Sequence, residues 1–123
     1  MALVLVVDDT EDTRDLYVEY LREHGYTVLG AENGKAGLEL AAARKPDVVV
    51  MDLSMPVMDG WEATKRIKAD PTLAHVLVLA ISGHATEDST RRAREAGADA
   101  ICAKPCLPGD VLKSIRELLA QRA

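Results

Sequence analysis

The sequence predicts an α/β fold: a doubly wound, parallel five-stranded sheet with helices on both faces, built as (βα)5. Five short apolar runs rich in β-branched residues alternate with five stretches of helical period. Strands that alternate with helices are joined by right-handed crossovers, which make the sheet parallel and cover both of its faces. The predicted strands are Leu3–Val7, Thr27–Gly30, Asp47–Met51, Val76–Ile81 and Ala98–Ala103.

The first two helices are predicted from apolar spacing and from a proline that ends a helix. The apolar face of the first helix recurs at helical spacing through Leu16, Tyr17, Tyr20, Leu21 and His24. The second helix runs from about Asn33 to Ala43. It stops before Lys45-Pro46, because the residue that precedes a proline avoids the helical region.

The other three helices follow the third, fourth and fifth strands. One begins near Gly60, and the next runs from about Thr86 to Ala96 with Gly97 as its C-terminal cap. The last helix has Asp110 in its first turn, where an acid is favourable, and ends at about Ala120. Its apolar stripe consists of Val111, Leu112, Ile115, Leu118 and Leu119.

Composition limits the kinds of protein that this chain can be. Its 123 residues suit one domain spanning 1–123, and 48% hydrophobic residues favour a globular core over disorder. A net charge of −5 without a cluster of Lys or Arg argues against nucleic acid as a partner. The sequence has no apolar stretch of membrane-spanning length and no signal-like segment, so we expect a cytoplasmic protein with no membrane partner.

Cys102 and Cys106 are the only cysteines. In the cytoplasm we expect them to stay reduced rather than form a disulfide. Two cysteines and scattered histidines lack the spacing of a zinc site, so Cys102 is interpreted as a small buried hydrophobic residue.

Polar side chains follow the apolar runs at the points where strands end. Asp8 and Asp9 follow the first strand, Asp52 the third, Ser82 the fourth and Lys104 the fifth. Because parallel strands place their carboxyl ends on one edge of the sheet, these side chains should share a pocket. Two carboxylates about 4 Å apart repel by about 4 kcal/mol at an effective dielectric of about 20, so the pocket should attract a cation. Three carboxylates suit Mg²⁺.

This set of groups suits one reaction in particular. A carboxylate can act as a nucleophile that forms a covalent acyl phosphate. A divalent metal and a lysine can neutralise the charge on the transferring phosphoryl oxygens, and a hydroxyl can hydrogen-bond to one of them. The residues therefore predict phosphoryl transfer to an aspartate.

Five stretches of the chain carry a resemblance to a known family: Leu5–Asp9, Val50–Gly60, Ala80–Gly83, Gly97–Ala100 and Lys104-Pro105. Together, and in this order, they resemble the receiver domain of response regulators in two-component signalling. The resemblance covers the whole chain. It implies a chemotaxis-regulator-like, single-domain receiver with the flavodoxin-like strand order 2-1-3-4-5.

The resemblance also implies roles for the acidic residues. Asp52 is then the phosphoacceptor. Asp9, Asp52 and the backbone carbonyl of Ser54 are the expected Mg²⁺ ligands, while Asp8 should act mainly through bound water. The implied cofactor is Mg²⁺.

Ser82 and Lys104 complete the implied site. The Ser82 hydroxyl should donate to a phosphoryl oxygen, and Lys104 should pair first with Asp52 and then with the phosphoryl group. The resemblance further implies a cis peptide between Lys104 and Pro105. The implied partners are a histidine kinase or histidine phosphotransfer protein as donor, and a downstream protein target.

Three positions depart from the family's usual pattern. The hydroxyl position is often Thr and is here Ser82, which lacks the methyl group that stiffens the side chain. A switch position that is usually aromatic is here Ile101. Two positions that tune dephosphorylation are here Ser54 and His84.

Other interpretations use the same residues. Asp8 and Asp9 could form a solvated helix start. A metal-dependent phosphatase with an aspartyl nucleophile is a second function, but such enzymes carry an Asp-x-Asp motif, and here the acids are adjacent. A flavin-binding electron carrier needs a hydroxyl-rich phosphate loop, and the first loop here is acidic. A scaffold that never accepts phosphate would not need the acceptor set. We therefore expect a switch, not an enzyme acting on outside substrates, and a stand-alone receiver if the chain is the full protein.

Overall fold

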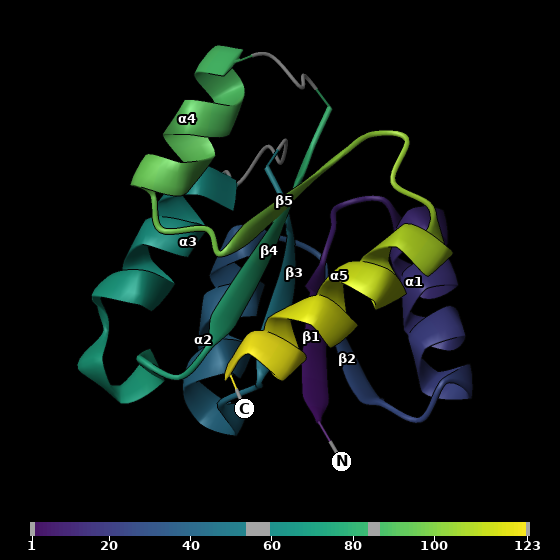
Figure 1. The fold of residues 1–123 in the computed structure, drawn as a ribbon. Coiled ribbons are helices and arrows are strands. Elements are labelled where there is room, and N and C mark those ends of the chain that lie inside the picture. The colour runs from purple at the N-terminus through teal and green to yellow at the C-terminus, as the bar shows by residue number, and fades with distance from the viewer. Residues whose placement is uncertain (1, 54–59, 84–86, 123) are drawn as a thin grey trace.

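A computed structural model describes residues 2–53, 60–83 and 87–122. Within these ranges the strands form one sheet in the order β2-β1-β3-β4-β5, and every neighbouring pair is parallel (Figure 1). The strands are β1 (Leu3–Val7), β2 (Thr27–Ala31), β3 (Val48–Asp52), β4 (Leu77–Ser82) and β5 (Ala100–Ala103). The predicted fold class and strand order are confirmed.

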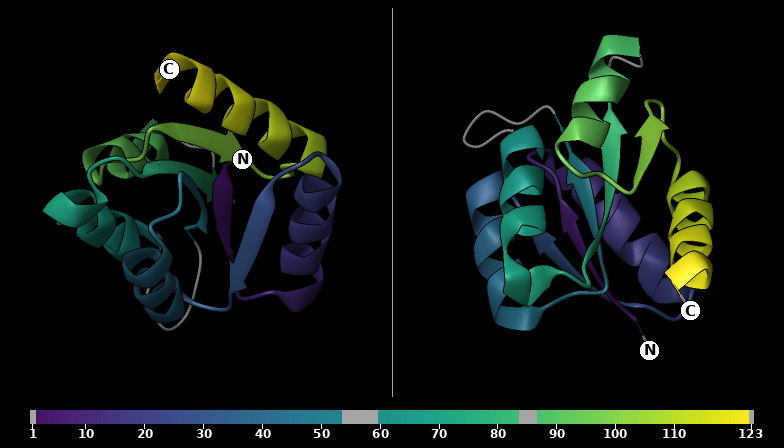
Figure 2. Two further views of the ribbon diagram at one scale, coloured as in Figure 1. Left: turned by 90° about the horizontal axis from the view of Figure 1, so that it is seen from below. Right: turned by 60° about the vertical axis from the view of Figure 1, so that its left-hand side comes forward.

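Helices cover both faces of the sheet. They are α1 (Glu11–Glu23), α2 (Gly34–Arg44), α3 (Gly60–Ala69), the short 3-10 helix η1 (Pro71–Leu73), α4 (Glu87–Glu95) and α5 (Pro108–Arg122). Seen from below in Figure 2, α1 and α5 lie on one side of the sheet, whereas α2 and α3 lie on the other. None of the described helices is both long and apolar enough to cross a membrane.

The two faces of the sheet carry separate cores because successive strand residues point in opposite directions. Val4 and Val6 of β1 pack toward α1 and α5, while Leu5 and Val7 pack toward α2 and α3. All five residues of β3 are buried, as expected of a central strand in a parallel sheet. A third cluster, with Leu53, Ala80 and Ala93, packs α4 against the sheet.

The predicted apolar face of α1 was partly wrong. Leu16 is 54% exposed, whereas Val18, which the prediction omitted, is buried beside Tyr17 and Leu21. The buried stripe is centred on Tyr17 and Leu21, which lie four residues apart, and Leu16 falls to one side of it. His24 lies outside the helix as its exposed C-terminal cap.

Three strands start later than predicted: β3 by one residue, β4 by one and β5 by two. For β4 and β5, the backbone of the first predicted residue is hydrogen-bonded to the preceding helix. The backbone N–H of Val76 donates to the carbonyl of Leu73 at the end of η1, and that of Ala98 donates to Ala93 in α4. The last helix is two residues longer than predicted and includes Arg122.

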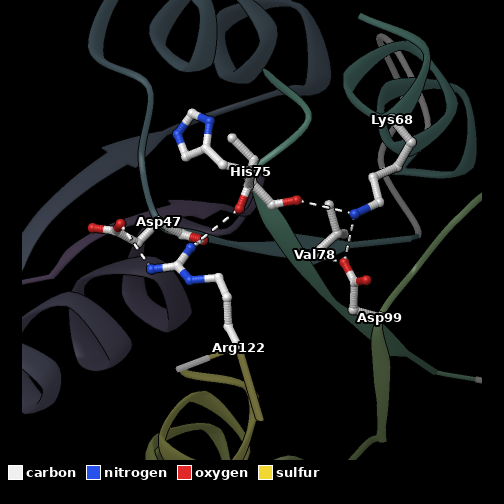
Figure 3. A network of polar contacts seen from close by, with 7 residues as sticks. Asp47, Lys68, His75, Val78, Asp99 and Arg122 are labelled. Atoms are coloured by element: carbon white, nitrogen blue, oxygen red, sulfur yellow. Dashed lines mark hydrogen bonds and ion pairs between the residues drawn. The ribbon is translucent and has the colours of Figure 1, made fainter. Parts of the chain in front are cut away.

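Arg122 binds the amino-terminal ends of two strands (Figure 3). Its Nη2 atom lies 3.1 Å from Asp47 Oδ1, and its Nη1 atom donates to the carbonyl of His75 at 3.1 Å. Asp47 precedes β3, and its Oδ2 atom also accepts a hydrogen bond from the backbone of Leu3 at 2.8 Å. The last turn of α5 is thus tied to the edge of the sheet where β1, β3 and β4 begin.

Lys68 of α3 makes a second polar link at the same end of the sheet (Figure 3). Its Nζ atom lies 2.8 Å from Asp99 Oδ2 and 3.0 Å from the carbonyl of Val76. Asp99 Oδ2 also accepts from the backbone of Val78 at 2.7 Å. These bonds fix the start of β5 against β4 and α3.

Replacing Asp47 with Asn is expected to lower stability at neutral pH and to lose that effect in acid. Burial tends to raise the pKa of Asp47, but hydrogen bonds from Leu3 and Arg122 and the charge of Arg122 outweigh it and hold the pKa below its ordinary 3.8. The stabilisation by the carboxylate is therefore complete above pH 3.8 and is lost as the pH falls through the folded-state value. Urea denaturation of both proteins between about pH 7 and about pH 3 measures this. A difference in stability that stays constant over that range would contradict it.

Candidate functional site

The predicted acidic residues meet at the carboxyl edge of the sheet. Asp52 is the last residue of β3, and Asp8 follows β1, the strand beside it. Asp8 and Asp52 are each 3% exposed, whereas Asp9 is exposed. One carboxylate oxygen from each of the three residues lies within 4.8 Å of the other two. The sequence prediction of one acidic pocket is confirmed in its geometry.

Local hydrogen bonds fix Asp8 in the pocket. Its Oδ1 atom accepts from the backbone N–H of Thr10 at 2.8 Å, and its carbonyl accepts from Arg14 Nη1 at 2.8 Å. Its own N–H donates to the carbonyl of Ala31 in β2. The residues just before α1 therefore orient this carboxylate, so Asp8 does lie at a helix start. It is buried there rather than solvated, because it also belongs to the pocket.

The electrostatics of the pocket favour a cation. Burial raises the pKa of Asp8, and the neighbouring charges of Asp52 and Asp9 raise it further against the lowering effect of the Thr10 N–H. Crowded, partly desolvated carboxylates gain most from a bound positive ion, and oxygen ligands at this spacing suit a hard divalent cation. The residues present therefore fit Mg²⁺.

Lys104 reaches the same pocket from the loop after β5. Its Nζ atom lies 3.2 Å from Asp52 Oδ2, although the two residues are 52 positions apart in the chain. Its backbone N–H donates to the carbonyl of Ser82 at 2.8 Å. The peptide between Lys104 and Pro105 is cis, as predicted.

Ser82 ends β4, which lies between β3, the strand that ends at Asp52, and β5, the strand that Lys104 follows. The register pairs Asp52 with Ile81 and Ser82 with Ala103, and Ser82 is 4% exposed. The structure thus brings the hydroxyl residue to the same sheet edge as the carboxylates and the ammonium. Ser54 and His84, which the sequence analysis also singled out, lie outside the described residues.

The expectation of two reduced cysteines was wrong for this structure. Cys102 and Cys106 form a disulfide with their Cα atoms 6.0 Å apart, within the usual range for such bonds. Cys102 is partly exposed at the end of the sheet, and Cys106 is 6% exposed. The chain turns back between β5 and α5, which brings the two residues together. A pair of cysteines four apart across a strand-ending turn was the available signal, but the prediction followed from the expected compartment.

The sequence analysis gave no functional role to Tyr17, which lies beside the pocket, or to Arg92, which lies on α4. Tyr17 of α1 donates its hydroxyl to the carbonyl of Cys106 at 2.6 Å, and burial together with Asp8 and Asp52 raises the pKa of Tyr17. Arg92 of α4 places its guanidinium 3.7 Å from the centre of the Trp61 ring. Neither contact has a signature in the sequence, because each joins helices or loops that are distant along the chain.

Fold and pocket together define a class: doubly wound α/β domains with an acidic cluster and a lysine at the carboxyl edge of the sheet. Comparison with known families gives a match over residues 4–116 to the response regulator receiver domain. The chain belongs to this family, whose members act in two-component signalling.

Individual relatives agree with this assignment. The protein PilH of Pseudomonas aeruginosa is 35% identical over 120 residues, covering 98% of the chain and 99% of PilH. The polar-differentiation response regulator DivK of Brucella anthropi is 31% identical over 116 residues, covering 94% of each protein. The crystallised chemotaxis protein CheY4 of Vibrio cholerae superposes with a TM-score of 0.90 at 29% identity, covering 95% of this chain and 98% of CheY4.

Proposed function

We propose that this chain accepts a phosphoryl group on Asp52 in a Mg²⁺-dependent reaction and signals to a protein partner by changing conformation. The donor is a histidine kinase or a histidine phosphotransfer protein. The observation that supports this most directly is the 3.2 Å approach of Lys104 Nζ to Asp52 Oδ2 beside the three-carboxylate cluster. A buried carboxylate with an ammonium on one side and a cation site on the other is suited to attack an electron-poor phosphorus.

Each residue of the pocket has a distinct part in this proposal. An oxygen of Asp52 attacks phosphorus as the bond from phosphorus to the donor's histidine nitrogen breaks, which leaves an acyl phosphate on Asp52. Lys104 pairs with Asp52 before transfer and with a phosphoryl oxygen after it. Ser82 donates its hydroxyl to another phosphoryl oxygen. Asp52 and Ser82 are the last residues of β3 and β4, and Lys104 follows β5, so the backbone places these groups before the phosphoryl group arrives.

The metal would be held by Asp9, Asp52 and the backbone carbonyl of Ser54, with Asp8 acting mainly through water. When bound, Mg²⁺ supplies positive charge that offsets the charge on the phosphoryl oxygens. Asp8 is nearly buried, and its hydrogen bond from the Thr10 N–H keeps its carboxylate directed into the pocket.

The proposal describes a switch that catalyses only its own phosphorylation and dephosphorylation. Residues 1–123 then act as a single receiver unit in the cytoplasm. The output face is formed by α4, β5 and α5. Ile101 is partly buried against the cluster that includes Ala80 and Ala93, so a shift of Ser82 at the end of β4 is transmitted to β5 and α4. Ile101 is shorter than the usual aromatic residue, and the repacking there should be correspondingly small.

Phosphorylation by a small donor tests the proposal without a kinase. Incubation with acetyl phosphate and Mg²⁺ should add one phosphoryl group, located on Asp52 by peptide mass spectrometry. Asp52→Asn should abolish the label because an amide is a poor nucleophile. Asp47→Asn is the matched control: Asp47 lies immediately before β3, Asp52 ends it, and this variant should label normally. Labelling that persists in Asp52→Asn, or in the presence of a metal chelator, would overturn the assignment.

A further inference from the structure

We infer that the Cys102–Cys106 disulfide is a reversible redox modification site that controls how firmly Lys104 is held against Asp52. The bond links residues four apart and closes a small ring that contains Lys104 and Pro105. Lys104 is the residue whose ammonium reaches Asp52. A covalent bond that brackets this lysine constrains the loop that positions it. The inference concerns the regulation of the pocket and rests on the function proposed above.

The two cysteines belong to different segments of the chain. Cys102 belongs to β5 and pairs in register with Ile81 of β4. Cys106 is part of the core beneath α1 and α5, and its carbonyl accepts the hydrogen bond from Tyr17. The disulfide therefore ties the loop after β5 back to β5 itself, beside the core under α1 and α5 that both cysteines contact.

Opening the bond removes one of the restraints on the loop between the two cysteines. The backbone of Lys104 keeps its hydrogen bond to the carbonyl of Ser82, and Cys106 keeps its bond from Tyr17. The loop itself gains conformations that the closed ring excludes, because a cross-link restricts the chain that it encloses. The lysine side chain is long and 40% exposed, so it depends on its backbone for its direction. We expect the reduced form to populate the Lys104–Asp52 contact less.

The exposure of the two cysteines determines which sulfur a reductant attacks first. Cys102 is partly exposed and Cys106 is nearly buried, so a thiolate from a small dithiol attacks the Cys102 sulfur. The Cys102–Cys106 bond breaks, and Cys106 leaves as a thiolate that takes up a proton. The second thiol of the reagent then attacks the mixed disulfide, which releases Cys102 and closes the reagent into a cyclic disulfide. Two electrons and two protons pass to the protein. A disulfide oxidant reverses the sequence, and the protein returns the electrons and protons to it.

A cysteine pair of this kind suits a regulatory disulfide rather than a permanent structural one. In a reducing compartment thiols are kept reduced, and the disulfides found there are usually transient, catalytic or redox-sensing. Oxidation would close the ring and favour phosphorylation, and reduction would reverse this.

The test compares oxidised protein, protein reduced with dithiothreitol, and the Cys102→Ser variant, all as the full chain with redox state verified by alkylation and intact mass. Cys102→Ser removes the bond at a partly exposed position, which limits the risk of misfolding. The first readout is the ¹³Cγ chemical shift of Asp52 in metal-free protein. Asp52 lies two strands from Cys102 in the sheet, so Lys104→Ala is measured beside it to calibrate how the shift responds to loss of the Lys104 ammonium. On reduction the shift should move toward the value measured in Lys104→Ala, and Cys102→Ser should match the reduced form.

The second readout is the rate of labelling by acetyl phosphate with Mg²⁺. The oxidised form should react about tenfold faster than the reduced form, a smaller change than the ~10²-fold that a 1 Å misplacement can cause. Cys102→Ser should react at the reduced rate with or without oxidant. An Asp52 shift that is identical in oxidised and reduced protein, or equal labelling rates, would overturn the inference, as would cysteines that no disulfide oxidant can pair. If no form is labelled, the proposed function fails, and the Asp52 shift still decides whether the disulfide holds Lys104.

Discussion

Replacing Lys104 with methionine is expected to slow phosphorylation of Asp52 by about 10²- to 10³-fold, the usual effect of removing one preorganised charge-stabilising donor. Methionine keeps an unbranched stem of similar length and removes the ammonium, both its charge and its hydrogen-bond donors. Lys104 Nζ lies 3.2 Å from Asp52 Oδ2. From this position the ammonium can pair with a phosphoryl oxygen as the phosphoryl group approaches Asp52. The rate of label incorporation from acetyl phosphate at saturating Mg²⁺ measures the loss.

Lys113→Met is the matched control for this substitution. Lys113 is exposed on α5 and lies outside the pocket loop. Its replacement by methionine changes the net charge by the same amount as Lys104→Met. It should leave the rate unchanged within about a factor of two, since the charge of an exposed helix residue is screened by water and salt. Both variants should unfold at nearly the wild-type denaturant midpoint. Equal rates for Lys104→Met and Lys113→Met would show that Lys104 has no part in the transfer.

Replacing Gly60 with alanine is expected to destabilise the protein and to impair the pocket together. Gly60 is the first residue of α3, and its N–H donates to the carbonyl of Leu53 at 3.3 Å. A Cβ atom at this position would collide with the carbonyl oxygen of Asp52 and lie 2.6 Å from Leu53 Cα. Both are backbone atoms, so the end of β3 would have to move. Overpacking of this kind costs about 1–3 kcal/mol.

Helix propensity alone predicts the opposite sign, because alanine favours a helix over glycine by about 1 kcal/mol. Gly109→Ala, in the first turn of α5, isolates that effect: its new Cβ atom would lie 3.5 Å from Tyr20 Oη, an ordinary contact. We expect Gly109→Ala to be neutral or stabilising in urea denaturation, and Gly60→Ala to lose stability and label more slowly. A Gly60→Ala variant as stable as the wild type would show that the start of α3 can yield without moving Asp52.

The fold and the position of the pocket could be predicted because both follow from repeating, short-range patterns. Runs such as Leu3–Val7 identify strands by composition alone, and parallel pairing then places the residues that follow them on one edge. Asp8 and Asp52 needed no further information to be brought together. The same logic located Lys104 after β5 and Ser82 at the end of β4.

The features that were missed depend on side-chain packing between distant segments. Leu16 was assigned to the buried face of α1, but the sequence does not show which side of a broad apolar stripe the sheet will cover. The bond from Tyr17 to Cys106 joins residues 89 positions apart. The Cys102–Cys106 disulfide was missed because the prediction of reduced cysteines followed from the expected cytoplasmic location alone.

The bonds from Arg122 to Asp47 and His75 hold the last turn of α5 in place, so the helix can tilt about that end. The helix has 15 residues, which gives an arm of about 22 Å at 1.5 Å per residue. With that end pinned to the base of β3 and β4, a tilt of about 3° would carry the first turn sideways by about 1 Å, on the arm length set by the helical rise. That first turn follows directly on Cys106 and Leu107, beside the loop of Lys104. A small movement of the Lys104 loop can therefore displace the first turn of α5 while the last turn stays in place.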